Sequence, residues 1–141
     1  MRRKLESIKT IIFHCLDVPP TKDFSIGDVD NWHRERGFAG VGYHFLIRKD
    51  GTIEYGRPLN IAGAHAKGFN HDSVGIATES GWKGEDTRTP ECIASCHSLA
   101  ESLVEVLPNI ENIIGHNMVS EKSCPNYDAF KEYNYLLCGN S

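Results

Sequence analysis

Two short aliphatic runs, each ending in a histidine, constrain the fold of this chain more than any other feature. Residues 11–13 (IIF) lead into His14, and residues 113–115 (IIG) lead into His116. Runs of this length and composition predict buried β-strands. Each imidazole should therefore lie where a strand leaves the core and meets solvent.

A cysteine in a polar loop completes a candidate metal site. Cys124 follows His116 by eight residues and is followed by Pro125, which restricts the backbone there. Two imidazoles and one thiolate suit a borderline-soft divalent metal, and three protein ligands with an open fourth position are typical of a catalytic site. The alternative is that these histidines are hydrogen-bonded residues at strand ends and that the cysteine fills an apolar space.

Ordered segments from about residue 8 to about residue 136 match one known family. The segments are 12–15 (IFHC), 41–54 (VGYHFLIRKDGTIE), 63–70 (GAHAKGFN), 72–76 (DSVGI), 115–117 (GHN) and 122–125 (KSCP). In this order and spacing they resemble the zinc N-acetylmuramoyl-L-alanine amidases, a superfamily shared with the peptidoglycan recognition proteins. The resemblance is strongest to the phage endolysin branch.

The resemblance assigns roles around a metal. It implies that His14, His116 and Cys124 hold one zinc ion and that Tyr43 and Lys122 are the catalytic side chains beside it. The cysteine is informative, because non-catalytic recognition proteins of the superfamily commonly lack the thiolate ligand. Retention of all these side chains favours an enzyme over a binding module.

The resemblance also places a substrate groove. It implies that His65, Asn70 and Ser73 lie on segments that line this groove. The chain departs from the family at residues 77–82 (ATESGW), where an aliphatic residue and two glycines are usual. We expect this departure to affect the groove wall and the fine substrate preference.

Amide hydrolysis requires a nucleophile, stabilisation of the tetrahedral oxygen and a proton for the departing amine. Zinc supplies the first two, provided that its histidine ligands are neutral and its cysteine ligand is deprotonated. We assign Tyr43 to positioning or deprotonating the attacking water, although its ordinary pKa of about 10 makes it a demanding base. We assign Lys122 to the developing oxyanion. The alternatives are a core tyrosine and an exposed, salt-bridged lysine.

The function implied by the resemblance is zinc-dependent hydrolysis of the bond between N-acetylmuramic acid and L-alanine in peptidoglycan, for lysis of a phage host. One alternative is a module that binds peptidoglycan without cutting it. Another is an added role, since endolysins of the T-odd phages also bind and inhibit the phage RNA polymerase. Residues 1–9 would be the segment to examine for that partner. We expect a monomer.

Composition excludes several other classes of protein. The length of 141 residues suits one domain spanning residues 1–141. A net charge of -4 argues against direct nucleic-acid binding, and the basic cluster at residues 34–36 is expected to be solvated surface. No apolar run reaches membrane-spanning length, and residues 1–10 lack the apolar core of a signal peptide. We therefore expect synthesis in the host cytoplasm, with action on the cell wall after release.

The pattern along the chain predicts an α/β (α+β) fold, with a mixed central β-sheet and helices packed on its faces, like the amidases and peptidoglycan recognition proteins. Residues 1–9 are expected to be a flexible segment, and residues 59–73 a functional loop. Period-two alternation places Tyr43 on the same side of its strand as Phe45 and Ile47. The expected strands are 8–15, 43–47, 52–56, 74–78 and one ending at His116, and the expected helices are 26–36, 90–107 and 128–137.

Overall fold

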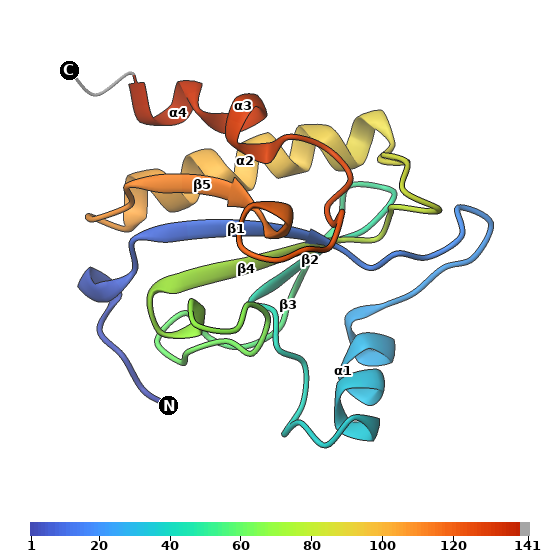
Figure 1. The fold of residues 1–141 in the computed structure, drawn as a ribbon, viewed down its shortest axis with the longest axis horizontal. Helices are drawn as coiled ribbons and strands as arrows, with labels where there is room; N and C mark the ends of the chain where they lie inside the picture. Colours follow the sequence, from blue (N-terminus) through green and yellow to red (C-terminus); the bar gives the residue numbers. More distant parts are fainter. Residues whose placement is uncertain (139–141) are drawn as a thin grey trace.

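The computed structural model describes residues 1–138, and its centre is a five-stranded sheet of order β3-β2-β4-β1-β5. Strand β1 runs parallel to β4 and β5, and β2 runs parallel to β4 but antiparallel to β3. The sheet is therefore mixed, as the sequence predicts (Figure 1). The strands are β1 (Thr10–Cys15), β2 (Phe45–Ile47), β3 (Ile53–Tyr55), β4 (Ser73–Thr78) and β5 (Asn112–Gly115).

Helices cover both faces of this sheet. Helix α2 packs on one face together with α3 and α4, and α1 packs on the other (Figure 1). The predicted α/β single-domain class is confirmed. The helices are α1 (Ile26–Glu35), α2 (Pro90–Val106), α3 (Ala129–Tyr133) and α4 (Tyr135–Cys138), and three short 3₁₀ turns are η1 (Leu5–Ser7), η2 (Asn70–Asp72) and η3 (His116–Met118).

Alternation along β1 explains why its sequence is apolar throughout. Ile11 and Phe13 belong to the core cluster on the α2 side, whereas Ile12 packs on the opposite face. The Phe13 ring stacks on the ring of Tyr133 in α3, with centroids 4.4 Å apart. Because both faces are covered, a strand at the middle of the sheet has no polar side. His14 emerges at the end of this strand, on the face of Ile12.

The two long helices begin where capping residues predict. Ser25 accepts a hydrogen bond from the Asp28 N–H while the Asp28 carboxylate accepts from the Ser25 N–H, which is a complete capping box. Thr89 caps α2, with Pro90 at its first position. The predicted terminal helix, however, is divided into α3 and α4, because a tighter i to i−3 hydrogen bond reaches the Asn134 carbonyl.

The expected side-chain alternation at Tyr43 is wrong. Phe45 and Ile47 belong to the cluster on the α2 side, but Tyr43 packs with Leu46 on the α1 side. Strand β2 begins only at Phe45, so residue 43 lies outside the regular pleat, where the period of two does not apply. This displacement brings the Tyr43 ring to the same face as His14.

The N-terminal segment is tied to the rest of the molecule, although the sequence suggested that residues 1–9 are flexible. The Arg3 guanidinium donates hydrogen bonds to the carbonyl oxygens of Leu59, Asn70 and His71 at 2.9–3.2 Å. These carbonyls lie in the long loop at residues 59–72. One rigid fork of donors therefore joins the N-terminus to this loop.

Four cysteines with placed side chains in the described part of the chain are free thiols: Cys15, Cys92, Cys96 and Cys124. Within residues 1–138, no helix has both the length and the apolar character needed to cross a bilayer.

Candidate active site

The three predicted metal ligands meet at one edge of the sheet. Candidate ligand atoms of His14, His116 and Cys124 all lie within 4.8 Å of one another. His14 is near the end of β1 and His116 directly follows the neighbouring parallel strand β5, so both imidazoles project from the same edge. Their ring centroids are 4.5 Å apart. The fold thus joins residues that are about a hundred positions apart in the chain.

The protonation states of Cys124 and His14 suit a metal. Hydrogen bonds from Cys15, and then from His116 and His14, lower the pKa of Cys124 well below its ordinary value. Conversely, hydrogen bonding to Cys124 and burial raise the pKa of Cys15. Burial lowers the pKa of His14, which keeps that imidazole neutral. A thiolate and neutral imidazoles are the forms that bind zinc, so the donor set fits this ion.

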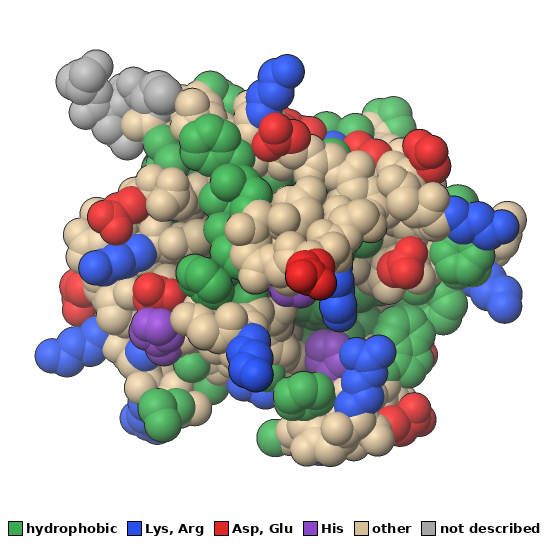
Figure 2. All heavy atoms as spheres, viewed as in Figure 1, with side chains coloured by type: hydrophobic (Ala, Val, Ile, Leu, Met, Phe, Trp, Pro, Cys, Tyr) green, Lys and Arg blue, Asp and Glu red, His purple; other side chains and the backbone are tan. Residues whose placement is uncertain are grey.

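A groove with a volume of about 1140 Å³ opens over the three residues. Its walls come from the end of α1, the loop at residues 64–70 and the loop at residues 116–126. Figure 2 shows histidine atoms at the surface of one face with lysine and arginine side chains around them. The groove lining contains more cationic than acidic side chains, with Arg36, Lys67 and Lys122 against Asp17.

Tyr43 lies in the wall of this groove, as its predicted catalytic role requires. Its ring centroid is 5.0 Å from that of His14 and 5.4 Å from that of His33. Burial raises the pKa of Tyr43, so the hydroxyl is protonated at neutral pH. Among residues 1–138 this hydroxyl has no hydrogen-bond partner. It is therefore free to bind a group that enters the groove.

Lys122 lies on the rim of the same groove. Its side chain is exposed, and no carboxylate of the described residues lies within ion-pair distance of its ammonium group. Burial is the main cause of the lowered pKa of His14, and the positive charge of Lys122 makes a smaller contribution in the same direction. The alternative of an ordinary salt-bridged lysine thus receives no support from the structure.

The three residues predicted to bind substrate have different positions. His65 and Asn70 line the groove. The Asn70 Oδ1 accepts hydrogen bonds from the N–H groups of His65 and Ala66, at 2.8 and 2.9 Å, and so shapes the loop itself. Ser73 is fully buried beneath His65 and is absent from the groove lining. A direct contact between Ser73 and a bound substrate is therefore incompatible with this conformation.

Several groove residues were not found from the sequence. Arg36 and Phe38 follow the end of α1, His33 lies in its last turn, and Lys67 lies in the loop after His65. The cluster containing Arg36 was expected to be solvated surface. Tertiary packing of α1 against the sheet brings it to the groove, and no local pattern distinguishes it from other surface arginines.

The unusual segment at residues 77–82 has a structural role. The side chain of Glu79 is only 1% exposed, and it accepts hydrogen bonds from the Arg48 guanidinium and from the N–H groups of Lys49 and Phe24. Phe24 lies just before α1, which forms one wall of the groove. Glu79 therefore ties the end of β4 to the connection that sets the position of this wall.

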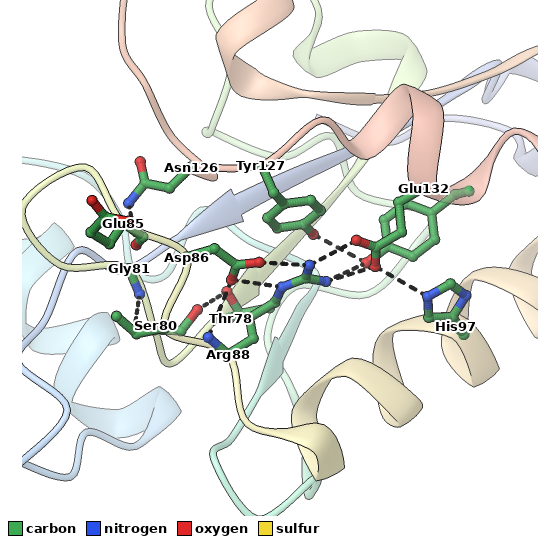
Figure 3. Close-up of polar contacts among 12 residues, drawn as sticks. Thr78, Ser80, Gly81, Glu85, Asp86, Arg88, His97, Asn126, Tyr127 and Glu132 are labelled. Atoms are coloured by element: carbon green, nitrogen blue, oxygen red, sulfur yellow. Dashed lines mark hydrogen bonds and ion pairs between the residues drawn. The ribbon is translucent and has the colours of Figure 1, made fainter.

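A buried arginine fixes the segment that follows Cys124 (Figure 3). Arg88, whose side chain is 3% exposed, forms ion pairs with Asp86 and Glu132 at 2.9 and 2.8 Å. Its guanidinium also lies 3.5 Å from the centre of the Tyr127 ring. Because Tyr127 is three residues beyond Cys124, this network determines where the ligand loop ends.

Comparison with known proteins agrees with this geometry. Residues 4–127 match the family described as N-acetylmuramoyl-L-alanine amidase. The chain is 36% identical over 132 residues to the endolysin of Escherichia phage T7, covering 89% of this chain and 85% of that protein. It is also 36% identical over 126 residues to the endolysin of Enterobacteria phage T3, with 85% and 82% covered. The chain belongs to the N-acetylmuramoyl-L-alanine amidase family.

Solved structures give the same result. The N-acetylmuramoyl-L-alanine amidase LysC from Clostridium intestinale superposes with a TM-score of 0.83 and 35% identity, over 95% of this chain and 87% of that one. Drosophila PGRP-LB superposes with a TM-score of 0.76 and 28% identity, over 89% and 78%. The expected fold and the expected enzyme class, an N-acetylmuramoyl-L-alanine amidase, are both confirmed.

Proposed function

We propose that this enzyme is a zinc-dependent phage endolysin that hydrolyses the amide bond between N-acetylmuramic acid and L-alanine in the peptidoglycan of its host. The observation that carries the proposal is the convergence of His14, His116 and Cys124 at the base of a large groove. The relatives named as endolysins come from phages, and other relatives are named as peptidoglycan-recognition proteins. The expected site of action is the cell wall.

The reaction adds water across one amide bond. When bound by these three residues, zinc supplies a Lewis acid that polarises the carbonyl and lowers the pKa of water. The C–N bond breaks, the lactyl group of the sugar becomes a carboxylate, and the amine of L-alanine takes up the proton.

Tyr43 and Lys122 have separate roles in the reaction. The protonated Tyr43 hydroxyl, free of partners among the described residues, positions the attacking water by hydrogen bonding. Its raised pKa favours this positioning role over that of a phenolate base. The Lys122 ammonium on the rim stabilises the negative charge that develops on the carbonyl oxygen.

Product analysis tests this proposal. Purified peptidoglycan should release free L-alanine amino termini without new reducing sugar ends, because an amide and not a glycosidic bond is cut. A chelator should stop the release, and added zinc should restore it. Cys124→Ala, which removes the thiolate, should lose both zinc and activity. Reducing ends without new amino termini would contradict the proposal.

The same experiment separates the enzyme from a binding module. A non-catalytic peptidoglycan-binding protein would co-sediment with the cell wall but would release no amino termini even when loaded with zinc. Turbidity clearing alone does not decide the matter, because glycosidases and amidases both clear cell walls. For the metal site, we expect elemental analysis to find stoichiometric zinc in protein purified without added metal.

A further inference from the structure

His65 uses both of its ring nitrogens within the protein. Its Nδ1 lies 2.8 Å from Nε2 of His14, and its Nε2 lies 3.2 Å from the hydroxyl of Ser73. The rings of His14 and His65 are almost perpendicular, at 85°. A hydrogen-bonded chain therefore runs from a candidate zinc ligand to a fully buried serine. Since imidazole has only two ring nitrogens, none is left to hydrogen bond with a substrate.

The His65 ring occupies a slot that two glycines create. A Cβ atom at Gly75 would lie 2.6 Å from Cγ and Cδ2 of His65, and a Cβ atom at Gly63 would lie 2.5 Å from Cδ2. The Asn70 side chain fixes the backbone on the other side of the same loop residue. The absence of side chains at both glycines leaves room for the ring beside β4. The fold thus holds the ring at one position.

The direction of these hydrogen bonds follows from metal binding. Because His65 engages Nε2 of His14, Nδ1 is the ring nitrogen of His14 that remains for a metal. A neutral imidazole that binds a metal through Nδ1 carries its proton on Nε2. His14 is then the donor to Nδ1 of His65, and His65 donates its own Nε2–H to Ser73.

We propose that His65 and Ser73 are positioning residues that hold His14 in the tautomer and orientation that bind zinc. The inference rests on the proposed zinc-dependent function. Metal-bound histidines commonly donate their second N–H to a carboxylate, a carbonyl or a water, and such partners orient the ligand and increase its basicity. Here an imidazole, itself oriented by a serine, takes that place. His65 therefore acts through His14 and does not form a polar contact with the substrate.

Zinc affinity tests the inference directly. His65→Leu removes the acceptor while filling much of the slot, and it should weaken zinc binding by about 10–100-fold, the range usual for lost partners of metal ligands. His65→Gln retains an acceptor oxygen and should recover part of the affinity. Ser73→Ala should have a smaller effect of the same sign. Competition with a chromophoric chelator measures each dissociation constant, and thermal unfolding shows whether each variant is folded.

His97→Leu is the matched control. It makes the same chemical change in α2, where the imidazole bonds to Glu132 and Tyr135 and is remote from the groove lining. Its zinc affinity should equal that of the parent. At saturating zinc, the KM of the folded His65 variants for peptidoglycan fragments should be unchanged. An increase in KM with unchanged zinc affinity would overturn the inference in favour of substrate binding.

A second measurement needs no variant. Long-range ¹H–¹⁵N correlation spectra of the parent protein distinguish the two tautomers of each histidine. In the zinc-loaded protein His14 should carry its proton on Nε2, and a proton on Nδ1 there would overturn the inference. If His65→Leu binds zinc as tightly as the parent protein, the inference is overturned but the proposed function is not. A parent protein that binds no zinc would contradict the proposed function instead.

Discussion

The backbone N–H of Cys15 donates a hydrogen bond of 3.0 Å to the sulfur of Cys124, although 109 residues separate the two. Cys15 is the last residue of β1 and directly follows His14. The sheet edge that presents one candidate ligand therefore also holds the other in place. Hydrogen bonding to sulfur favours the thiolate, so the same contact prepares Cys124 for a metal.

Close packing behind this contact predicts that Gly81→Ala destabilises the protein and weakens zinc binding. A Cβ atom at Gly81 would lie 2.5 Å from the Cys15 sulfur, and the residue has φ of +86°. Gly84 has a similar φ of +81° but open space around it, so Gly84→Ala is a matched control. Backbone strain should lower the free energy of unfolding of both variants by about 1–2 kcal/mol. Overpacking should lower that of Gly81→Ala by about 1–3 kcal/mol more. Urea unfolding and chelator competition measure the difference, and equal effects at both sites would contradict the expectation.

Tyr43→Phe should separate catalysis from folding. The substitution keeps the ring that packs beside His14 and removes only the hydroxyl, which has no partner among the described residues. Zinc content and the unfolding midpoint should stay the same, while kcat should fall by about 10²–10⁴-fold, as for a lost acid–base group. Full activity would restrict Tyr43 to a packing role.

Lys122→Met should reduce kcat by about 10²–10³-fold, as expected for the loss of one oxyanion-stabilising group. Lys122→Arg should restore part of the rate, because the positive charge returns with a different shape. Lys67→Met, at another cationic residue of the groove lining, serves as the comparison and should affect KM more than kcat. Steady-state kinetics on a soluble muropeptide gives both constants, and a kcat unaffected by Lys122→Met would remove Lys122 from the chemistry.

Arg88→Met should lower the free energy of unfolding by up to about 3 kcal/mol, because it removes the arginine that pairs with two carboxylates. The effect is limited since Asp86 and Glu132 are 32% and 24% exposed and retain some hydration. Arg34→Met is the control, as its ion pair with Asp30 is at the surface and should contribute little. Chemical unfolding compares the two, and similar losses would show that the buried network in Figure 3 has no special importance.

Acid should destabilise the zinc-free protein partly through His44. Burial lowers the pKa of His44 from 6.5 to about 4, so between these values the unfolded chain binds more protons than the folded one. The contribution of His44 to the free energy of unfolding is therefore fully present above about pH 6.5. It falls by at most about 3 kcal/mol as the pH decreases to 4. Unfolding curves at several pH values measure the slope, which His44→Gln should flatten. An unchanged slope would assign the effect to the other buried histidines.

Local signals in the sequence were sufficient for most of the secondary structure. Ser25 and Asp28 formed the expected capping box, and Thr89 and Pro90 began the expected helix. These features depend on residues within one turn of each other, which is why they are visible in the sequence. Tyr43 was placed on the wrong side because the end of a strand depends on its neighbours in the sheet and not on its own alternation.

The sequence by itself determined the family, the order of strands and helices, and the identity of the residues that meet at the candidate zinc site. Only the tertiary structure decided how the surrounding residues are used. It buried Ser73 beneath His65, directed both nitrogens of that ring into the protein, and turned the unexpected Glu79 into a support for the groove wall. The physical reason is that ligand chemistry is a property of residue type, whereas hydrogen-bond partners and burial are set by contacts between distant segments.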